Sequence, residues 1–149
     1  MNKQIINKVL QTKAGLGSLA IRVPVGIVLA AHGGQKLFGW FGGYGLEGTG
    51  QWMESIGLSP GFLMALLAGS VEFFGGLALV LGLFTRPVAL LAAFTMLVAI
   101  FTAHISNGLF ISNGGFEYAL VLFSATLALT FQGAGRFSLD NRLVKLVGR

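Results

Sequence analysis

The sequence predicts an all-α protein, an integral membrane bundle of four helices forming a single domain over residues 1–149. Hydrophobic residues make up 54% of the 149 residues and charged residues only 10%. The mean hydropathy is +0.80. So few charged side chains cannot cover the surface of a water-soluble domain of this length. Most of the chain is therefore expected to contact lipid.

Four apolar stretches predict the membrane spans. A hydrocarbon core about 30 Å thick needs about 20 helical residues. The stretches that meet this requirement lie at about residues 16–38, 61–83, 86–105 and 115–132. Helix signals flank them, because Ser59-Pro60 predicts an N-cap followed by the first helical position, and Gly82 and Gly133 predict helix ends.

Basic residues lie on one side of these spans. They precede the first span, separate the second from the third, and follow the fourth, as Lys3, Lys8, Lys13, Arg86, Arg136, Arg142, Lys145 and Arg149. The loops after the first and third spans contain no Lys or Arg. By the positive-inside rule both termini face the cytoplasm, and those two loops face the periplasm of a bacterium. We therefore expect an inner-membrane protein that binds no nucleic acid.

Amphipathic segments occur at both ends of the chain. Residues 2–13 and 138–147 each place apolar side chains on one helical face and polar ones opposite. Both segments are expected to lie in the cytoplasmic interface of the bilayer as anchors.

The first periplasmic loop, residues 39–59, is rich in glycine and aromatic residues. Within it, residues 49–56 predict a short helix with Trp52, Met53 and Ile56 on one side. Two interpretations stay open. The aromatic side chains form a belt at the membrane surface, or the segment is a lid over an outward-facing cavity.

Six ionisable residues fall inside the predicted spans and are the candidate functional residues. They are Arg22, His32, Lys36, Glu72, His104 and Glu117. A charged group at the bilayer centre costs about 2.5–3.5 kcal/mol on insertion scales, so such residues normally face the bundle interior and pair. Every span contributes at least one. This pattern predicts a polar constellation between the helices.

The role of each candidate residue leaves alternatives open. Arg22 is expected either to extend to cytoplasmic headgroups or to pair with Glu72. Glu117 either complements the dipole of its own helix or joins the constellation, and His104 is either a hydrogen-bonded edge residue or a proton carrier. Glu72, near mid-membrane among small residues, fits a proton path, a contact for a quinone carbonyl, or interhelical packing. Lys36 or Arg22 is its expected partner.

No metal site and no set of catalytic residues is predicted. The chain has no cysteine, which excludes disulfides and thiolate metal sites. No span has the Glu-x-x-His pairing of di-iron bundles. The chain is expected to be at most a subunit of an oxidoreductase, with no redox centre of its own.

Several short motifs occur in a fixed order along the chain. They are His32-Gly33, KLFG at 36–39, Gly42-Gly43, Glu72 before Gly75-Gly76, LGLFTRP at 81–87, His104, and GGFE at 114–117. Over about residues 17–140 this order resembles the DoxX family of small bacterial membrane proteins. The resemblance implies a four-helix inner-membrane protein. Similar proteins include the membrane subunit of a thiosulfate to quinone oxidoreductase and components of oxidative-stress complexes.

Three functional hypotheses follow. The first is a redox-associated subunit that binds a quinone or another small molecule between the helices, with Glu72, His32 and Lys36 contacting its polar groups and a partner protein carrying the redox centre. The second is a small-solute or proton-coupled carrier that acts as a homo-oligomer. The third is a scaffold or assembly factor whose polar residues only fix helix packing. The resemblance favours the first.

Overall fold

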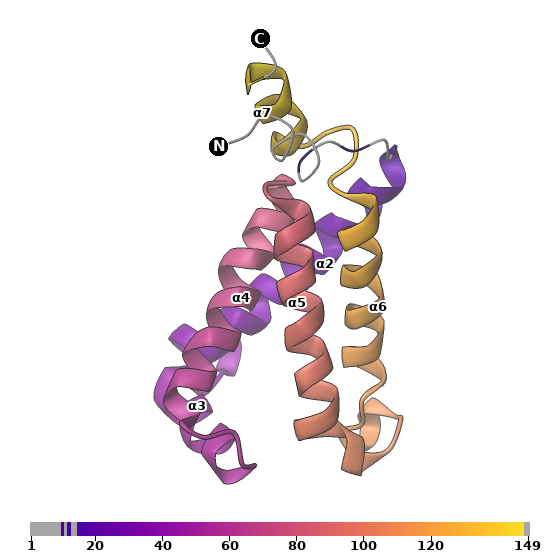
Figure 1. The fold of residues 1–149 in the computed structure, drawn as a ribbon. Coiled ribbons are helices and arrows are strands. Elements are labelled where there is room, and N and C mark those ends of the chain that lie inside the picture. Colours follow the sequence, from indigo (N-terminus) through magenta and orange to yellow (C-terminus); the bar gives the residue numbers. More distant parts are fainter. Residues whose placement is uncertain (1–9, 11, 13–14, 148–149) are drawn as a thin grey trace.

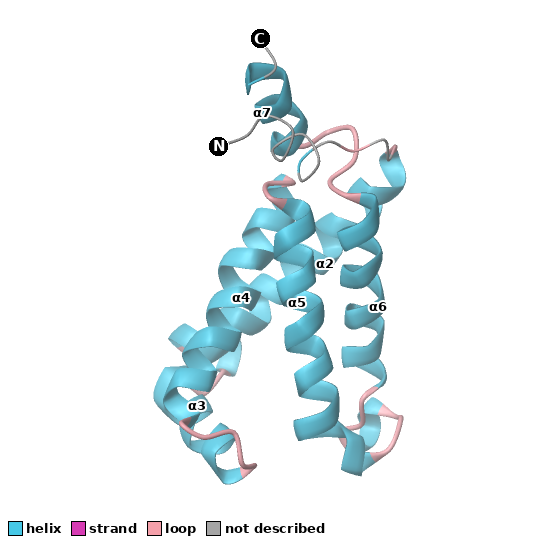
Figure 2. Cartoon of the chain, viewed as in Figure 1, coloured by secondary structure: helices cyan, strands magenta, loops and turns pink. Residues whose placement is uncertain are grey.

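A computed structural model describes residue 10, residue 12 and residues 15–147, and these residues form helices and no strand (Figure 2). The main helices are α2 (Leu16–Phe38), α3 (Gly45–Ser55), α4 (Gly61–Leu81), α5 (Thr85–Ala99), α6 (Glu117–Gln132) and α7 (Leu139–Val147). The all-α prediction is confirmed. The expected anchor at residues 2–13 lies outside the described residues, apart from Leu10 and Thr12.

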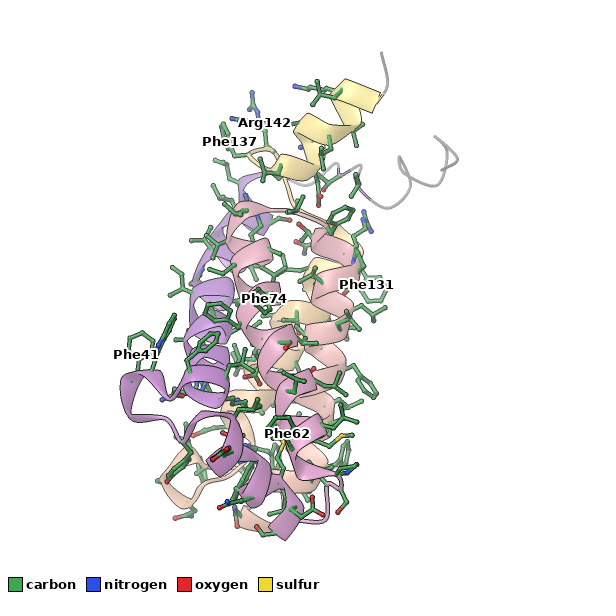
Figure 3. All side chains as sticks on the ribbon, turned by 90° about the vertical axis from the view of Figure 1, so that its left-hand side faces the viewer. Phe41, Phe62, Phe74, Phe131, Phe137 and Arg142 are labelled. Carbon is green, nitrogen blue, oxygen red and sulfur yellow. The ribbon has the colours of Figure 1, made fainter. Side chains whose placement is uncertain are left out.

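Among the described residues, three segments are long and apolar enough to cross a membrane: Leu16–Phe38, Gly61–Leu81 and Thr85–Asn107. The helix α6 is also apolar but shorter, with 16 residues. Phe62, Phe74 and Phe131 point outward from the bundle and are 55%, 60% and 71% exposed (Figure 3). Apolar side chains exposed in this number along the helices indicate contact with lipid.

The long helices run along the same bundle, with α3 at one end and α7 at the other (Figure 1). We call these the α3 end and the α7 end. The helix α2 packs along α4, and α5 packs along α6. A tight turn joins α4 to α5 at the α7 end, and the two helices separate toward the α3 end (Figure 1). The buried core includes Leu29, Leu79, Met96 and Leu122.

Glycines end the helices where the sequence predicts. Gly82 follows α4 with φ 67° and ψ 44°, a left-handed conformation that glycine adopts at little cost. Gly133 follows α6. The helix α4 therefore ends at Leu81, two residues before the predicted end of the second span at residue 83. The N–H of Leu83 bonds back to the carbonyl of Ala78 and closes the helix.

The helix α4 starts at residue 61 as predicted, but its N-cap differs from the prediction by one residue. Pro60, not Ser59, occupies the N-cap position, and Gly61 is the first helical residue. The cap is supplied by Glu54, whose carboxylate accepts hydrogen bonds from the Ser59 hydroxyl and the Gly61 N–H. These contacts lower the pKa of the Glu54 carboxyl below its ordinary value. They also tie α3 to α4.

The third and fourth spans meet in a more irregular loop than predicted. The α-helical part of the third span ends at Ala99 and continues as a π-helix over Ile100–His104 and a 3-10 turn over Ile105–Asn107. The fourth span starts at Glu117 rather than residue 115. The N–H groups of Gly115 and Phe116 bond to loop carbonyls instead of starting a helix.

Close approach of α2 and α4 depends on glycine. A Cβ built on Gly76 would lie 2.5 Å from the backbone nitrogen of Ala30 and 2.5 Å from the carbonyl oxygen of Gly26. A Cβ on Gly26 would meet the same contact from the other side, 2.6 Å from the carbonyl oxygen of Gly76. Since both neighbours are backbone atoms, no side-chain movement can make room.

Replacing Gly76 by Ala is therefore expected to lower the free energy of unfolding by about 1–3 kcal/mol through overpacking. Gly17→Ala is the matched control, because Gly17 also lies in a spanning helix and its Cβ would meet nothing within 4 Å. The control should leave stability unchanged or raise it by up to about 1 kcal/mol. Thermal unfolding in detergent measures both. Equal stability of the two variants would show that α2 and α4 are not in this close contact.

Candidate functional site

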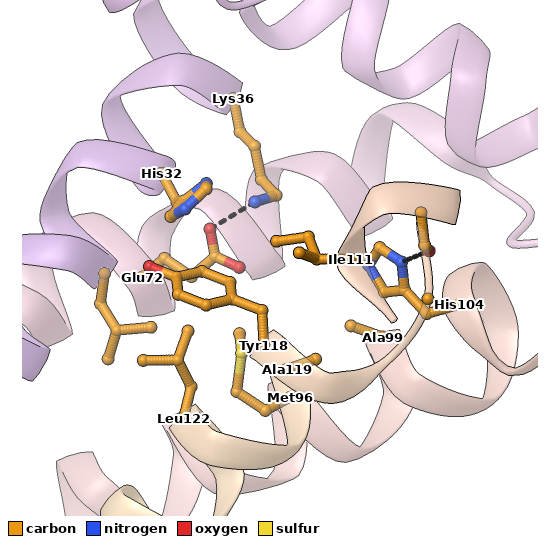
Figure 4. A pocket seen from close by; sticks show the side chains of 13 residues that line it. His32, Lys36, Glu72, Met96, Ala99, His104, Ile111, Tyr118, Ala119 and Leu122 are labelled. Carbon is orange, nitrogen blue, oxygen red and sulfur yellow. Dashed lines mark hydrogen bonds and ion pairs between the residues drawn. The ribbon is translucent and has the colours of Figure 1, made fainter. Parts of the chain in front are cut away.

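A cavity of about 300 Å³ lies toward the α3 end, enclosed by α2, α4, α5, α6 and the loop before α6. It brings together four of the predicted site residues: His32, Lys36, Glu72 and His104. The remaining wall is mostly apolar and includes Met96 and Leu122 (Figure 4). The helices thus place a polar group of side chains in an otherwise apolar pocket.

Lys36 and Glu72 form the central contact of this cavity. The Lys36 Nζ donates a hydrogen bond to Glu72 Oε2 at 2.6 Å, within an ion pair. The Glu72 side chain is only 4% exposed, and that of Lys36 is 23% exposed. Of the two partners that the sequence allowed for Glu72, the structure selects Lys36. The pairing lets both charges lie between the helices without an uncompensated buried charge.

Tyr118 lines the same cavity and was not among the predicted site residues. Its ring contacts the His32 ring at a centroid distance of 5.9 Å. Figure 4 shows the Tyr118 ring between the Lys36–Glu72 pair and the apolar side chains of Met96 and Leu122. The sequence contained one signal, because Tyr118 precedes the cavity-lining Leu122 by four residues and so shares its helix face.

His104 lies at the far side of the cavity, at the end of the π-helix. Its Nδ1 lies 2.8 Å from the carbonyl oxygen of Gly114. A carbonyl can only accept a hydrogen bond, so Nδ1 carries the hydrogen, and Nε2 of the neutral ring is left as an acceptor. π-Helical turns are often found at functional sites. Both interpretations of His104, edge residue and proton carrier, fit this geometry.

Arg22 lies apart from the cavity, near the α7 end, and has neither of its expected roles. Its side chain is 1% exposed, so it does not extend to headgroups, and it does not contact Glu72. Instead its guanidinium donates to backbone carbonyls at the end of α4 and in the loop after α6, those of Leu79, Val80, Ala134 and Phe137. The carbonyls at a helix end have no donor within the helix, and Arg22 supplies one.

Asp140 makes a second group of buried contacts at the α7 end, beside those of Arg22. Its carboxylate accepts hydrogen bonds from the N–H groups of Phe84 at 2.6 Å and Thr85 at 2.9 Å, at the start of α5. Asp140 is 1% exposed. The C-terminal helix was expected at residues 138–147 and forms over Leu139–Val147. It is docked on the bundle through Asp140.

Glu117 also lies outside the lining of the cavity. It is the first residue of α6, and its Oε1 accepts a hydrogen bond from the N–H of Ile111 at 2.6 Å. A carboxylate at this position also complements the positive end of the helix dipole. Glu117 therefore holds the loop that closes one side of the cavity.

The DoxX family profile matches residues 17–105 of the chain. The chain belongs to the DoxX family. Its relatives include a Bacillus subtilis (strain 168) protein named "Putative oxidoreductase CatD", 41% identical over 77% of this chain and 79% of that protein. The Escherichia coli (strain K12) inner membrane protein YqjF is 34% identical over 87% of this chain and 94% of that protein.

A second Escherichia coli (strain K12) protein, the inner membrane protein YphA, is 31% identical over 83% of this DoxX-family chain and 88% of that protein. No solved structure matches the chain at a significant level. The relatives and the long apolar helices together identify a membrane protein. Among the described residues of this DoxX protein, no group of three His, Cys, Asp or Glu is placed to hold a metal ion.

Proposed function

We propose that this DoxX-family chain spans the bacterial inner membrane four times and binds the head of a quinone in the cavity beside Lys36 and Glu72. In this proposal it is a subunit of an oxidoreductase whose partner protein carries the redox centre. The observation that carries the proposal is an apolar cavity in which the ion pair and the Tyr118 hydroxyl are grouped.

The topology of the proposal rests on length and charge. At 1.5 Å per residue the 16 residues of α6 extend about 24 Å, and the turns at its ends bring it close to the thickness of a hydrocarbon core. Among the described residues, Arg86, Arg136, Arg142 and Lys145 lie at the α7 end. By the positive-inside rule the α7 end faces the cytoplasm, and the cavity opens nearer the periplasmic side.

The cavity suits a small ring with carbonyl groups. Its volume of about 300 Å³ lies at the lower end of the range for small-molecule sites. The Lys36 ammonium can donate to a carbonyl oxygen. Within the described part of the chain the Tyr118 hydroxyl makes no hydrogen bond, so it too can donate. Because Glu72 already balances the charge of Lys36, the pocket favours a neutral head over an anion.

A redox role is supported by the name of one relative and by the two hydrogen-bond donors of the cavity, Lys36 and Tyr118. A quinone supplies a reversible carrier of electrons and protons, and a relative from Bacillus subtilis is named "Putative oxidoreductase CatD". The chain itself has no cysteine. A partner protein is therefore proposed as the source of electrons. The residues of this chain would hold and orient the quinone head.

Replacing Tyr118 by Phe tests the assignment of the cavity. Loss of one hydrogen bond of about 0.5–1.5 kcal/mol is expected to weaken quinone binding about threefold to tenfold, with the unfolding temperature unchanged. Tyr44→Phe is the control, because Tyr44 is 84% exposed and lies outside this cavity. Titration of the purified protein in lipid nanodiscs measures the affinity. Equal loss in both variants, or in neither, would contradict the assignment.

A proton-coupled carrier is the second candidate, and one observation favours it. Lys36 also lines a separate cavity of about 420 Å³ beneath the loop before α3, together with Gln35 and Thr49. Polar side chains there would give water a route toward the Lys36–Glu72 pair. This candidate predicts transport by the chain alone in liposomes, abolished by Glu72→Gln.

A further inference from the structure

A further cavity of about 440 Å³ lies between α3, α4 and α5, where α4 and α5 separate toward the α3 end (Figure 1). We call it the lateral groove. The helix α3 contributes Trp52 and Met53 to it, and Ile56 follows from the turn after α3. These are the side chains that the sequence placed on one side of a belt or lid helix. In the structure they form part of the groove wall.

The open side of the lateral groove faces the apolar surface of the bundle. Leu67 on α4 and Leu91 and Phe94 on α5 line it and are 53%, 55% and 63% exposed. In a membrane, side chains at this surface contact acyl chains rather than water. An apolar molecule can therefore pass from the bilayer into the groove without crossing an aqueous phase.

The lateral groove and the cavity that holds Tyr118 share one wall. Lys36, Glu72, Ala99 and His104 line both. Two mostly apolar spaces thus meet at the ion pair. Beyond this shared wall, most of the groove is lined by apolar side chains, such as Val71 and Val98.

We propose that the ligand is a quinone with a long apolar chain, which enters from the bilayer between α4 and α5, leaves its chain in the lateral groove and places its head in the cavity between Tyr118 and the Lys36–Glu72 pair. This inference rests on the proposed function and adds the class of quinone and its route. A head without a chain would leave the groove unfilled. A phospholipid fits less well, because its phosphate would approach Lys36, whose charge is already balanced by Glu72.

Photo-crosslinking tests the position of the chain. The probe is a benzoquinone with a long alkyl chain ending in a diazirine, added to the protein in phosphatidylcholine nanodiscs. Peptide mass spectrometry is expected to find crosslinks on α4 and α5 around Val71, Thr95 and Val98, which line the groove and are partly buried. An excess of the tail-bearing quinone without the diazirine should remove these crosslinks.

Thr95→Phe tests whether the groove contributes to affinity. Thr95 lines the groove, and its hydroxyl donates to the carbonyl of Leu91 one helical turn earlier. Ser124 is a matched control, because its hydroxyl donates to the carbonyl of Leu120 in the same way and it lies outside the groove. Thr95→Phe is expected to weaken binding of the tail-bearing quinone about tenfold or more, because several chain carbons lose their burial. Ser124→Phe should have no effect.

The tail-less benzoquinone separates the two proposals. It is expected to bind to the native protein and to Thr95→Phe with the same affinity. If both quinones bind but the crosslinks fall only on outward positions and Thr95→Phe binds the tail-bearing quinone normally, the lateral groove is not the site of the chain, while the proposed function stands. If neither quinone binds, the proposed function fails and the inference fails with it.

Discussion

Glu72→Gln is expected to lower the free energy of unfolding by about 3 kcal/mol and to weaken quinone binding, because the unbalanced charge of Lys36 makes the cavity less suited to a neutral head. The substitution removes the negative charge that pairs with the Lys36 ammonium. The Glu72 side chain is only 4% exposed in the native protein, so water cannot replace that charge. Breaking a buried ion pair by removing one partner costs about 3–5 kcal/mol. Because the Lys36 side chain is 23% exposed, the expected loss of stability lies at the lower end of this range. Thermal unfolding in detergent measures the stability, and titration in nanodiscs measures binding.

The double variant Lys36→Met with Glu72→Met separates stability from binding. Both charges are then removed, and an apolar pair of similar length is expected to restore the unfolding temperature to near the native value. Quinone binding should be lost, because the donor at Lys36 is gone. If the double variant binds quinone like the native protein, the ion pair only fixes helix packing, as a scaffold would require.

Arg22→Met is expected to destabilise the protein by about 3–5 kcal/mol. Arg22 is 1% exposed and donates to the carbonyls of Leu79, Val80, Ala134 and Phe137, which would be left without these donors. Arg22→Lys should recover little, since an ammonium cannot reach all of these acceptors as the guanidinium does. Thermal unfolding compares the variants.

The control for Arg22 is Arg142→Met. Arg142 lies on α7, is exposed and extends away from the bundle (Figure 3). Its replacement should change stability by no more than about 0.5 kcal/mol. Quinone affinity of the folded fraction should be unchanged in both variants, because neither residue lines the cavity. A native unfolding temperature for Arg22→Met would mean that the contacts at the α7 end contribute little.

The sequence predicted the helices well where a local rule decides the structure. The first span has the predicted bounds, Leu16–Phe38, because an apolar run ends at Gly39, which takes the left-handed conformation. Gly82 ends α4 for the same reason. The predicted N-cap of α4 was wrong by one residue because Glu54, on another helix, supplies the cap. Such a contact is not visible in the residues next to Pro60.

The sequence also predicted the charged residues and the histidines that line the cavity, Lys36, Glu72, His32 and His104, because a charge inside a membrane must find a partner. The sequence did not decide whether Lys36 or Arg22 is the partner of Glu72, because both lie on the same face of the first span. The packing of α2 on α4 brings Lys36 to Glu72. The role of Arg22 was wrong because its acceptors are backbone carbonyls, which carry no signal in the sequence. Tyr118 was missed because an aromatic residue near a helix end is typical of a membrane interface.

The most direct test of the central claim is quinone content after gentle purification from the native membrane. Mass spectrometry of the extracted lipids is expected to find a long-chain quinone in about equal molar amount to the native protein. The double variant Lys36→Met with Glu72→Met, at matched yield, should retain none above the level of bulk lipid. Equal quinone in both proteins, or only bulk lipid in the native one, would contradict a quinone site at the Lys36–Glu72 pair.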